Sequence, residues 1–173
     1  MLSAEDNEIL TRSGPGTAMG RVLRRYWQPL ALVAELPEER PLADVRVLGE
    51  DLVVFRDEAG CYGALARRCA HRAGDLAYGR LEDGGLRCPY HGWLYGADGR
   101  CLDAPLEAEG HAFGRLKLPA YPVQEMGGLL FAYMGPQPAP MLPPWDLFVW
   151  PNAVRQIGYA VLEANWLQCQ ENS

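Results

Sequence analysis

The sequence has little of what a membrane protein, a disulfide-stabilised secreted protein or a nucleic-acid-binding protein needs. Its 173 residues include only five cysteines, an odd number that is too small for a disulfide framework. Sixteen Lys and Arg against 22 Asp and Glu give a formal net charge of −6, which leaves no basic stripe for phosphates. No apolar run reaches the roughly 18 residues of a membrane span, and the acidic start lacks the regions of a signal peptide. We therefore expect a soluble, cytoplasmic protein with no nucleic-acid or membrane partner.

Short apolar segments separated by turn residues fill the middle of the chain. The predicted strands cover residues 45–48, 52–55, 62–66, 86–88, 92–95, 121–124 and 129–133. The first two flank a Gly-Glu-Asp turn, which is a hairpin signal, and turns recur about every eight to twelve residues. This spacing is typical of an antiparallel sandwich or a small barrel. Ahead of the strands we expect one short helix between Thr17 and Trp27, ended by Pro29.

The composition changes after residue 135. Five prolines crowd residues 135–145, which indicates an extended and stiff linker. Beyond it, residues 155–163 are predicted to form one more strand, and Asn165 is predicted to cap the N-terminus of a helix. One strand and part of a helix cannot bury their own apolar faces, so we expect the chain to be the first part of a longer protein.

Two of the cysteines have a histidine close behind them. Cys69 is followed by His71 at the second position, and Cys88 by His91 at the third. Ligands this close in sequence sit on tight loops, where both side chains can converge on one metal centre. Together the loops supply the two Cys and two His that a Rieske-type [2Fe–2S] cluster takes, two per iron. With two thiolates the oxidised cluster has no net charge, which favours uptake of an electron and fits the high potentials of such centres.

A structural zinc ion is the alternative, because two Cys and two His also suit tetrahedral Zn²⁺. Zinc sites usually pair Cys with Cys and His with His, whereas each loop here mixes the two. The second loop also carries Pro89 and Gly92, where backbone amides can approach cluster sulfides, and Trp93, which can shield them. These features favour the cluster. The remaining histidine, His111, is expected at the surface.

The residues around these ligands resemble one family. The motifs are Cys69-Ala70-His71-Arg72 and Cys88-Pro89-Tyr90-His91-Gly92-Trp93. They resemble the Rieske domain of the Rieske non-haem iron oxygenases, the aromatic ring-hydroxylating α-subunits. Residues 25–29 and 79–88 resemble the phthalate-dioxygenase branch, which includes vanillate demethylase-like monooxygenases. The resemblance implies that Cys69 and Cys88 bind one iron and that His71 and His91 bind the other.

The resemblance also implies a fold and a domain order. The expected fold is all-β, an antiparallel Rieske sandwich with two cluster-binding hairpin loops, a short N-terminal helix and the start of an α+β catalytic domain. The expected parts are an N-terminal segment at 1–28, the Rieske domain at 29–135, the linker at 136–154 and the start of the catalytic domain at 155–173. One departure concerns loop 1, since the family commonly reads His-Arg-Gly-Ala where this chain has His71-Arg72-Ala73-Gly74.

The implied function is electron transfer within a mono- or dioxygenase. Electrons would arrive from an NAD(P)H-linked reductase or a ferredoxin and pass to a mononuclear Fe(II) whose ligands this chain lacks, so no catalytic residue is assigned. Neighbouring α-subunits, in a homotrimer, are the other expected partners. Respiratory Rieske proteins join their loops by a disulfide; this chain has Gly74 and Tyr90 in those places, which implies the lower end of the Rieske potential range. A stand-alone Rieske ferredoxin, a carrier without chemistry of its own, is the alternative.

Overall fold

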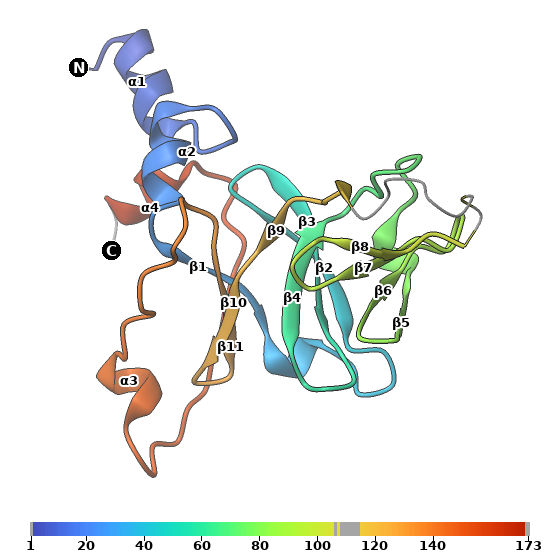
Figure 1. Cartoon of the computed structure of the whole chain (residues 1–173). Helices are drawn as coiled ribbons and strands as arrows, with labels where there is room; N and C mark the ends of the chain where they lie inside the picture. The colour runs from blue at the N-terminus through green and yellow to red at the C-terminus, as the bar shows by residue number, and fades with distance from the viewer. Residues whose placement is uncertain (1, 106, 108–114, 172–173) are drawn as a thin grey trace.

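Three small antiparallel sheets make up the body of the protein in the computed structural model, which describes residues 2–105, 107 and 115–171 (Figure 1). The first sheet, in spatial order, consists of β1 (Trp27–Leu32), β11 (Leu129–Tyr133) and β10 (Val123–Met126). The second consists of β2 (Leu42–Val47), β3 (Glu50–Arg56), β4 (Tyr62–Ala66) and β9 (Ala120–Tyr121). The third consists of β5 (Arg80–Glu82), β6 (Gly85–Arg87), β7 (Leu94–Gly96) and β8 (Cys101–Asp103). The all-β prediction is confirmed, and within the described residues the sheets do not close into a barrel.

Short helices lie outside the sheets. They are α1 (Ala4–Thr11), α2 (Ala18–Leu23), α3 (Asp146–Val149), α4 (Trp166–Gln170) and the 3₁₀ helices η1 (Val33–Glu35) and η2 (Leu76–Tyr78). Figure 1 shows α1, α2 and α4 together at one end of the molecule, where the Trp166 indole donates to the Leu10 carbonyl at 3.0 Å. Both chain ends therefore meet on the side away from the third sheet.

The N-terminal helix prediction was wrong in its end point. Thr17 is the N-cap of α2, since its side chain accepts from the Gly20 amide, but the helix ends at Leu23. Trp27 instead opens β1 and is buried against Phe131 and Tyr133 of β11. Burial of the indole in the core outweighs the local helical preference. Pro29 then fits into β1 because β1 is an edge strand of its sheet.

The core that matters for function lies between the second and third sheets. It contains side chains that are fully buried, among them Phe55, Leu65, Leu86 and Tyr95. Cys69 and Cys88 belong to the same cluster of buried residues, at 5% and 3% exposure. Fully burying one large apolar side chain contributes about 1.5–3 kcal/mol, so this core holds the two cysteine-bearing loops firmly.

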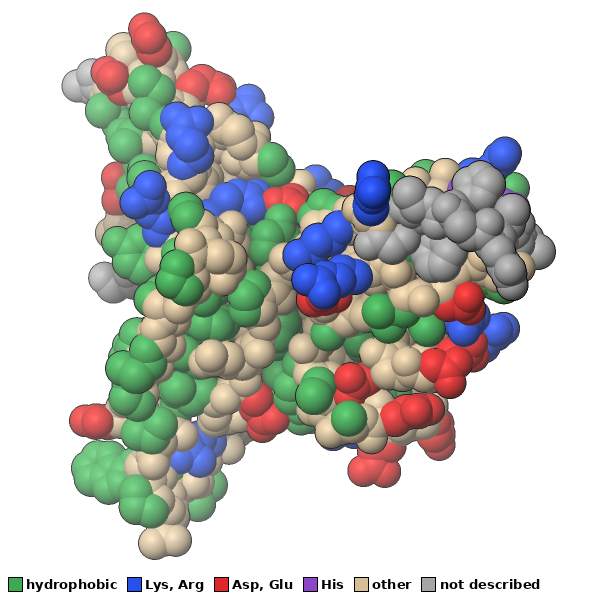
Figure 2. Space-filling view, in the orientation of Figure 1, with side chains coloured by type: hydrophobic (Ala, Val, Ile, Leu, Met, Phe, Trp, Pro, Cys, Tyr) green, Lys and Arg blue, Asp and Glu red, His purple; other side chains and the backbone are tan. Residues whose placement is uncertain are grey.

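The proline-rich stretch packs on the first sheet. The Trp27 indole donates to the Pro140 carbonyl at 3.0 Å, and Leu142 is buried in the cluster around Trp27. Directly after it, and still within the linker expected at 136–154, α3 forms one helical turn. Figure 2 shows hydrophobic side chains along the edge of the molecule on which α3 lies.

In the last part of the chain one prediction is confirmed and another is wrong. Asn165 caps α4, its side chain accepting from the Gln168 amide at 3.1 Å, as predicted. Residues 155–163 were predicted to form a strand, and this was wrong: they pair with no strand in the described part of the chain. No neighbouring strand among the described residues holds this segment in an extended conformation, and its side chains are exposed. None of the described helices has the length and apolar character needed to cross a membrane.

Candidate metal centre

The first predicted ligand loop, residues 69–74, follows β4 and precedes η2. The Cys69 amide donates to the Gly74 carbonyl at 2.9 Å, and the Ala73 amide donates to the Cys69 carbonyl at 2.8 Å. At the base of the loop, Arg68 and Asp75 form an antiparallel bridge. The loop is thus closed on itself, with the Cys69 side chain buried and His71 half-buried near its tip.

The second predicted ligand loop, residues 88–93, joins β6 to β7. The Cys88 amide donates to the Trp93 carbonyl at 2.8 Å, and the Gly92 amide donates to the Cys88 carbonyl at 3.1 Å. The backbone amides of Tyr90 and His91 donate to the Cys88 sulfur. Two backbone donors therefore lie at the Cys88 sulfur, and the approach of amides to the cluster sulfides stays a prediction.

The two loops bring the predicted ligands together in two pairs. The rings of His71 and His91 meet edge to face with their centroids 4.7 Å apart. The thiols of Cys69 and Cys88 interact directly. Each pair takes one residue from each loop, which is the pairing that a cluster with two Cys on one iron and two His on the other requires.

The charge state of the cysteine pair fits a metal group. Burial raises the pKa of the Cys88 thiol, and the adjacent Cys69 raises it further because two neighbouring thiolates repel each other. Two buried thiols this close become thiolates only with a compensating positive charge, which ferric iron supplies. The donor set is therefore chemically suited to a cluster that takes two thiolates.

Two polar atoms at this place lack a hydrogen-bond partner. Among the described residues, the buried side-chain nitrogens without a partner are His71 Nδ1 and Trp93 Nε1. The rings that carry them are stacked, 4.7 Å between centroids and 2° from parallel, and Trp93 is 4% exposed. Unpaired buried polar atoms are rare and costly. Both fall where the cluster is predicted, and the unpaired imidazole nitrogen is available to iron.

The zinc alternative finds no support in the geometry. In residues 2–105, 107 and 115–171, no three His, Cys, Asp or Glu side chains converge closely enough to hold a single metal ion. A structural zinc ion needs four converging ligands. Two separate pairs instead match a centre in which each iron takes only two protein ligands.

Loop 1 has an alanine in a strained backbone conformation and a glycine in a crowded place. Ala73 has a left-handed backbone, with φ of 53°, where the family commonly has glycine. Gly74 is needed for space, because a Cβ atom there would lie 2.9 Å from the Cys88 sulfur. In this chain glycine occupies the crowded position, and the loop closes through the Cys69–Gly74 hydrogen bond.

One functional side chain was missed in the sequence. The Tyr95 hydroxyl lies 3.2 Å from the Cys69 sulfur inside the core. The Ala70 amide donates to that hydroxyl, which leaves its proton for the sulfur. Burial raises the pKa of Tyr95, so it stays protonated. The available signal was its position two residues after Trp93 in the strand predicted at 92–95, where alternate side chains share a face.

We expect Tyr95→Phe to lower the reduction potential of the loaded protein. A hydrogen bond to a ligand sulfur stabilises the reduced, more negative state, and a bond of about 1 kcal/mol corresponds to about 40 mV for one electron. The measurement is a redox titration followed by visible absorbance. Tyr121→Phe is the matched control, because the Tyr121 hydroxyl donates to Glu50 at 2.7 Å and contacts neither ligand loop. Equal potentials in Tyr95→Phe and the parent chain contradict this role.

Three arginines lie in or next to loop 1 in the sequence, at positions 67, 68 and 72. Arg67, near loop 1, is largely covered and held by Asp75 and Asp44, whereas Arg68 is 65% exposed and Arg72 is exposed. Only the latter two are placed to meet an acidic partner. His111 lies outside the described residues.

Comparison with known proteins agrees with this geometry. The sequence profile of the Rieske [2Fe-2S] domain matches residues 26–122. The chain is 52% identical, over its whole length, to the oxygenase subunit of 5,5'-dehydrodivanillate O-demethylase from Sphingobium sp. (strain NBRC 103272 / SYK-6), covering 42% of that protein. It is 40% identical, again over its whole length, to the phthalate 4,5-dioxygenase oxygenase subunit of Pseudomonas putida, covering 40%. The chain thus spans about two-fifths of these relatives.

A solved structure agrees in fold as well. It is the reduced complex between oxygenase and ferredoxin in carbazole 1,9a-dioxygenase, with a TM-score of 0.64 and 30% sequence identity. The match covers 78% of this chain and 33% of that one. The resemblance found in the two ligand motifs is therefore confirmed by independent relatives.

Proposed function

The chain belongs to the Rieske [2Fe-2S] domain family, and from this premise we propose that it is the electron-entry part of an aromatic ring-hydroxylating oxygenase subunit. The observation that carries the proposal is the convergence of one Cys pair and one His pair from two facing loops. The relatives that align over the whole chain are oxygenase subunits, which favours this function over a stand-alone ferredoxin.

We assign the iron ligands to four residues: Cys69, His71, Cys88 and His91. When bound, the [2Fe–2S] cluster supplies one-electron chemistry between an electron donor and a mononuclear non-haem iron in the rest of the subunit. Cys69 and Cys88, as two thiolates, would balance the charge of +2 that two ferric ions and two sulfides carry together. His71 and His91 offer neutral nitrogens to the other, which keeps the overall charge near zero.

The surrounding side chains orient these ligands and exclude water. Trp93 covers His71 on its buried side, and the Tyr90 ring lies 3.8 Å from the His91 ring on its exposed side. The amides of Tyr90 and His91 and the hydroxyl of Tyr95 direct hydrogen bonds at the ligand sulfurs. These donors favour the reduced state, because they stabilise negative charge on sulfur.

The partners follow from the same proposal. A ferredoxin or an NAD(P)H-linked reductase is the expected electron donor, supported by the similarity to an oxygenase that was solved in complex with ferredoxin. Exposed Arg68 and Arg72 beside loop 1 suit an acidic donor. A homotrimer of full-length subunits and a cytoplasmic location stay predictions.

Iron stoichiometry separates the oxygenase from the ferredoxin. We expect the product of the complete reading frame to bind about three irons per chain, two in the cluster and one at a facial His–His–carboxylate site, whereas residues 1–173 bind about two. The measurement is colorimetric iron and sulfide analysis of both proteins after gel filtration. Two irons in both proteins, with no further metal, favour the stand-alone ferredoxin.

A further inference from the structure

Each ligand loop has a largely buried arginine at its base. Arg67 lies two residues before Cys69 and Arg87 directly before Cys88, with side chains that are 26% and 13% exposed. Charged side chains are seldom buried this far unless they are paired. We therefore expect both guanidinium groups to be paired with acceptors in or next to the ligand loops.

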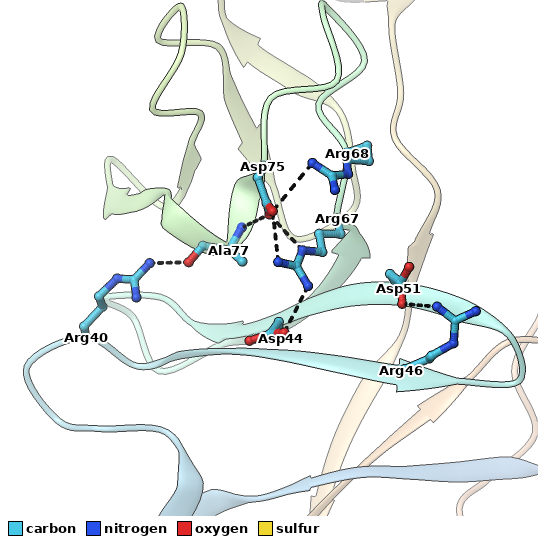
Figure 3. A network of polar contacts seen from close by, with 8 residues as sticks. All are labelled: Arg40, Asp44, Arg46, Asp51, Arg67, Arg68, Asp75 and Ala77. Carbon is cyan, nitrogen blue, oxygen red and sulfur yellow. Dashed lines mark hydrogen bonds and ion pairs between the residues drawn. The ribbon is translucent and has the colours of Figure 1, made fainter.

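Arg67 fastens the base of loop 1 to β2. Its Nε and Nη2 atoms each donate to one oxygen of Asp75 at 2.9 Å, and its Nη1 donates to Asp44 of β2 at 3.0 Å (Figure 3). Asp75 in turn accepts from the Ala77 amide at 3.1 Å and so starts η2. Loop 1 lies between the residues of this two-pronged pair, so the pair fixes both of its ends.

Arg87 fastens loop 2 in a similar way. Its Nη1 donates to the Gly92 carbonyl at 2.5 Å and to Asp103 of β8 at 2.8 Å. Its Nε donates to Glu82 of β5. The Gly92 carbonyl lies in the peptide between Gly92 and Trp93, directly after His91. Arg87 thus ties the histidine side of loop 2 to two strands of the third sheet.

Both arginines act on ionised partners. The hydrogen bond from Arg67 lowers the pKa of Asp75, and that from Arg87 lowers the pKa of Glu82. Charge-assisted bonds from a planar guanidinium are strong and directional, and lysine cannot reproduce the two-pronged geometry. No disulfide holds the loops in place, because the five cysteines, Cys69 and Cys88 included, are all free.

We propose that Arg67 and Arg87 are positioning residues that hold the two ligand loops in register, so that the Cys and His pairs converge on the cluster. The inference rests on the proposed function, because it assigns the loops to a cluster. Each of these two ion-pair clamps ties its own loop to a strand of the adjoining sheet, and the packing of the second sheet against the third then brings the two loops together.

An exposed ion pair on the β2–β3 hairpin provides the matched control. Arg46 of β2 pairs with Asp51 of β3 at 2.7 Å, but their side chains are 67% and 51% exposed and neither contacts a ligand loop (Figure 3). Surface pairs of this kind contribute little to stability. Arg46→Lys therefore repeats the chemical change of Arg67→Lys and Arg87→Lys at an arginine outside both clamps; its partner Asp51 accepts from the Arg67 amide at 3.0 Å through a backbone carbonyl, which the substitution leaves in place.

The test compares the three lysine variants of the iron-loaded chain. Iron release to a ferrous chelator under reducing conditions is expected to be about tenfold faster in Arg67→Lys and Arg87→Lys, because each loses part of a charge-assisted pair. Their EPR lines after dithionite reduction are expected to broaden, since ligand geometry becomes heterogeneous, while far-UV circular dichroism stays that of the parent. Arg46→Lys is expected to match the parent in all three measurements.

Asp75→Asn and Asp103→Asn keep the side-chain shapes and answer the same question if a lysine variant does not fold. Parent-like release rates and line widths in the clamp variants overturn the inference, as does an equal change in Arg46→Lys. In both cases the parent still binds iron and the proposed function stands. A parent chain that binds no iron overturns the function itself.

Discussion

Gly74→Ala is expected to weaken iron binding by about tenfold to a hundredfold, even though it adds a single methyl group. That methyl carbon would lie 2.9 Å from the Cys88 sulfur and 3.1 Å from the Tyr90 Cβ. Cys88 cannot retreat, because it is 3% exposed within the core. Overpacking of this kind costs about 1–3 kcal/mol. Here the strain falls on the contact between the loops, so the ligand pairs move apart.

The measurement for Gly74→Ala is the iron retained per folded chain at a series of chelator concentrations. Gly158→Ala is the control, because a Cβ there has no neighbour within 4 Å and its backbone is not in the left-handed region. If Gly74→Ala retains iron as the parent does, the two loops do not meet as the structure has them.

Loss of either histidine ligand is expected to abolish the Rieske-type EPR signal. His71→Ala and His91→Ala each leave one iron with a single protein ligand, and no neighbouring residue is placed to substitute: in the described chain, no third His, Cys, Asp or Glu joins either pair. The shared iron atoms and sulfides make the cluster a unit, so removing one ligand affects the whole centre.

The measurement is EPR of the dithionite-reduced protein, with iron and sulfide determined on the same sample. Replacing the third histidine of the sequence, His111→Ala, is the control and is expected to leave the signal unchanged. An anisotropic signal that persists in both His71→Ala and His91→Ala contradicts the assignment of these residues as ligands.

The two loops that bring the Cys and His pairs together could be predicted because the sequence signals for them are local. Cys and His separated by one or two other residues indicate a tight loop. The hairpin between β2 and β3 is indicated by a Gly-containing turn. The strand Leu129–Tyr133 was predicted with its observed bounds for the same reason. Local spacing and turn chemistry act over a few residues, which is the range that sequence patterns report.

The contacts that support the ligands could not be predicted, because they join distant residues. Tyr95 meets Cys69 across 26 positions of the chain, and Arg67 meets Asp44 across 23. The helix predicted over Thr17–Trp27 ended early for the same reason, since Trp27 packs on β11. The strand predicted at residues 155–163 has the alternating pattern but no neighbouring strand in the described chain. An alternating pattern indicates a strand, but the strand forms only where a neighbouring strand supplies the backbone hydrogen bonds.

The most direct test of the central claim is a joint determination of iron, acid-labile sulfide and zinc in the purified chain, with EPR after dithionite reduction. We predict about two irons and two sulfides per chain, a brown colour and an anisotropic signal from the reduced centre. A colourless protein with one zinc per chain and no signal contradicts the claim that Cys69, His71, Cys88 and His91 hold a [2Fe–2S] cluster.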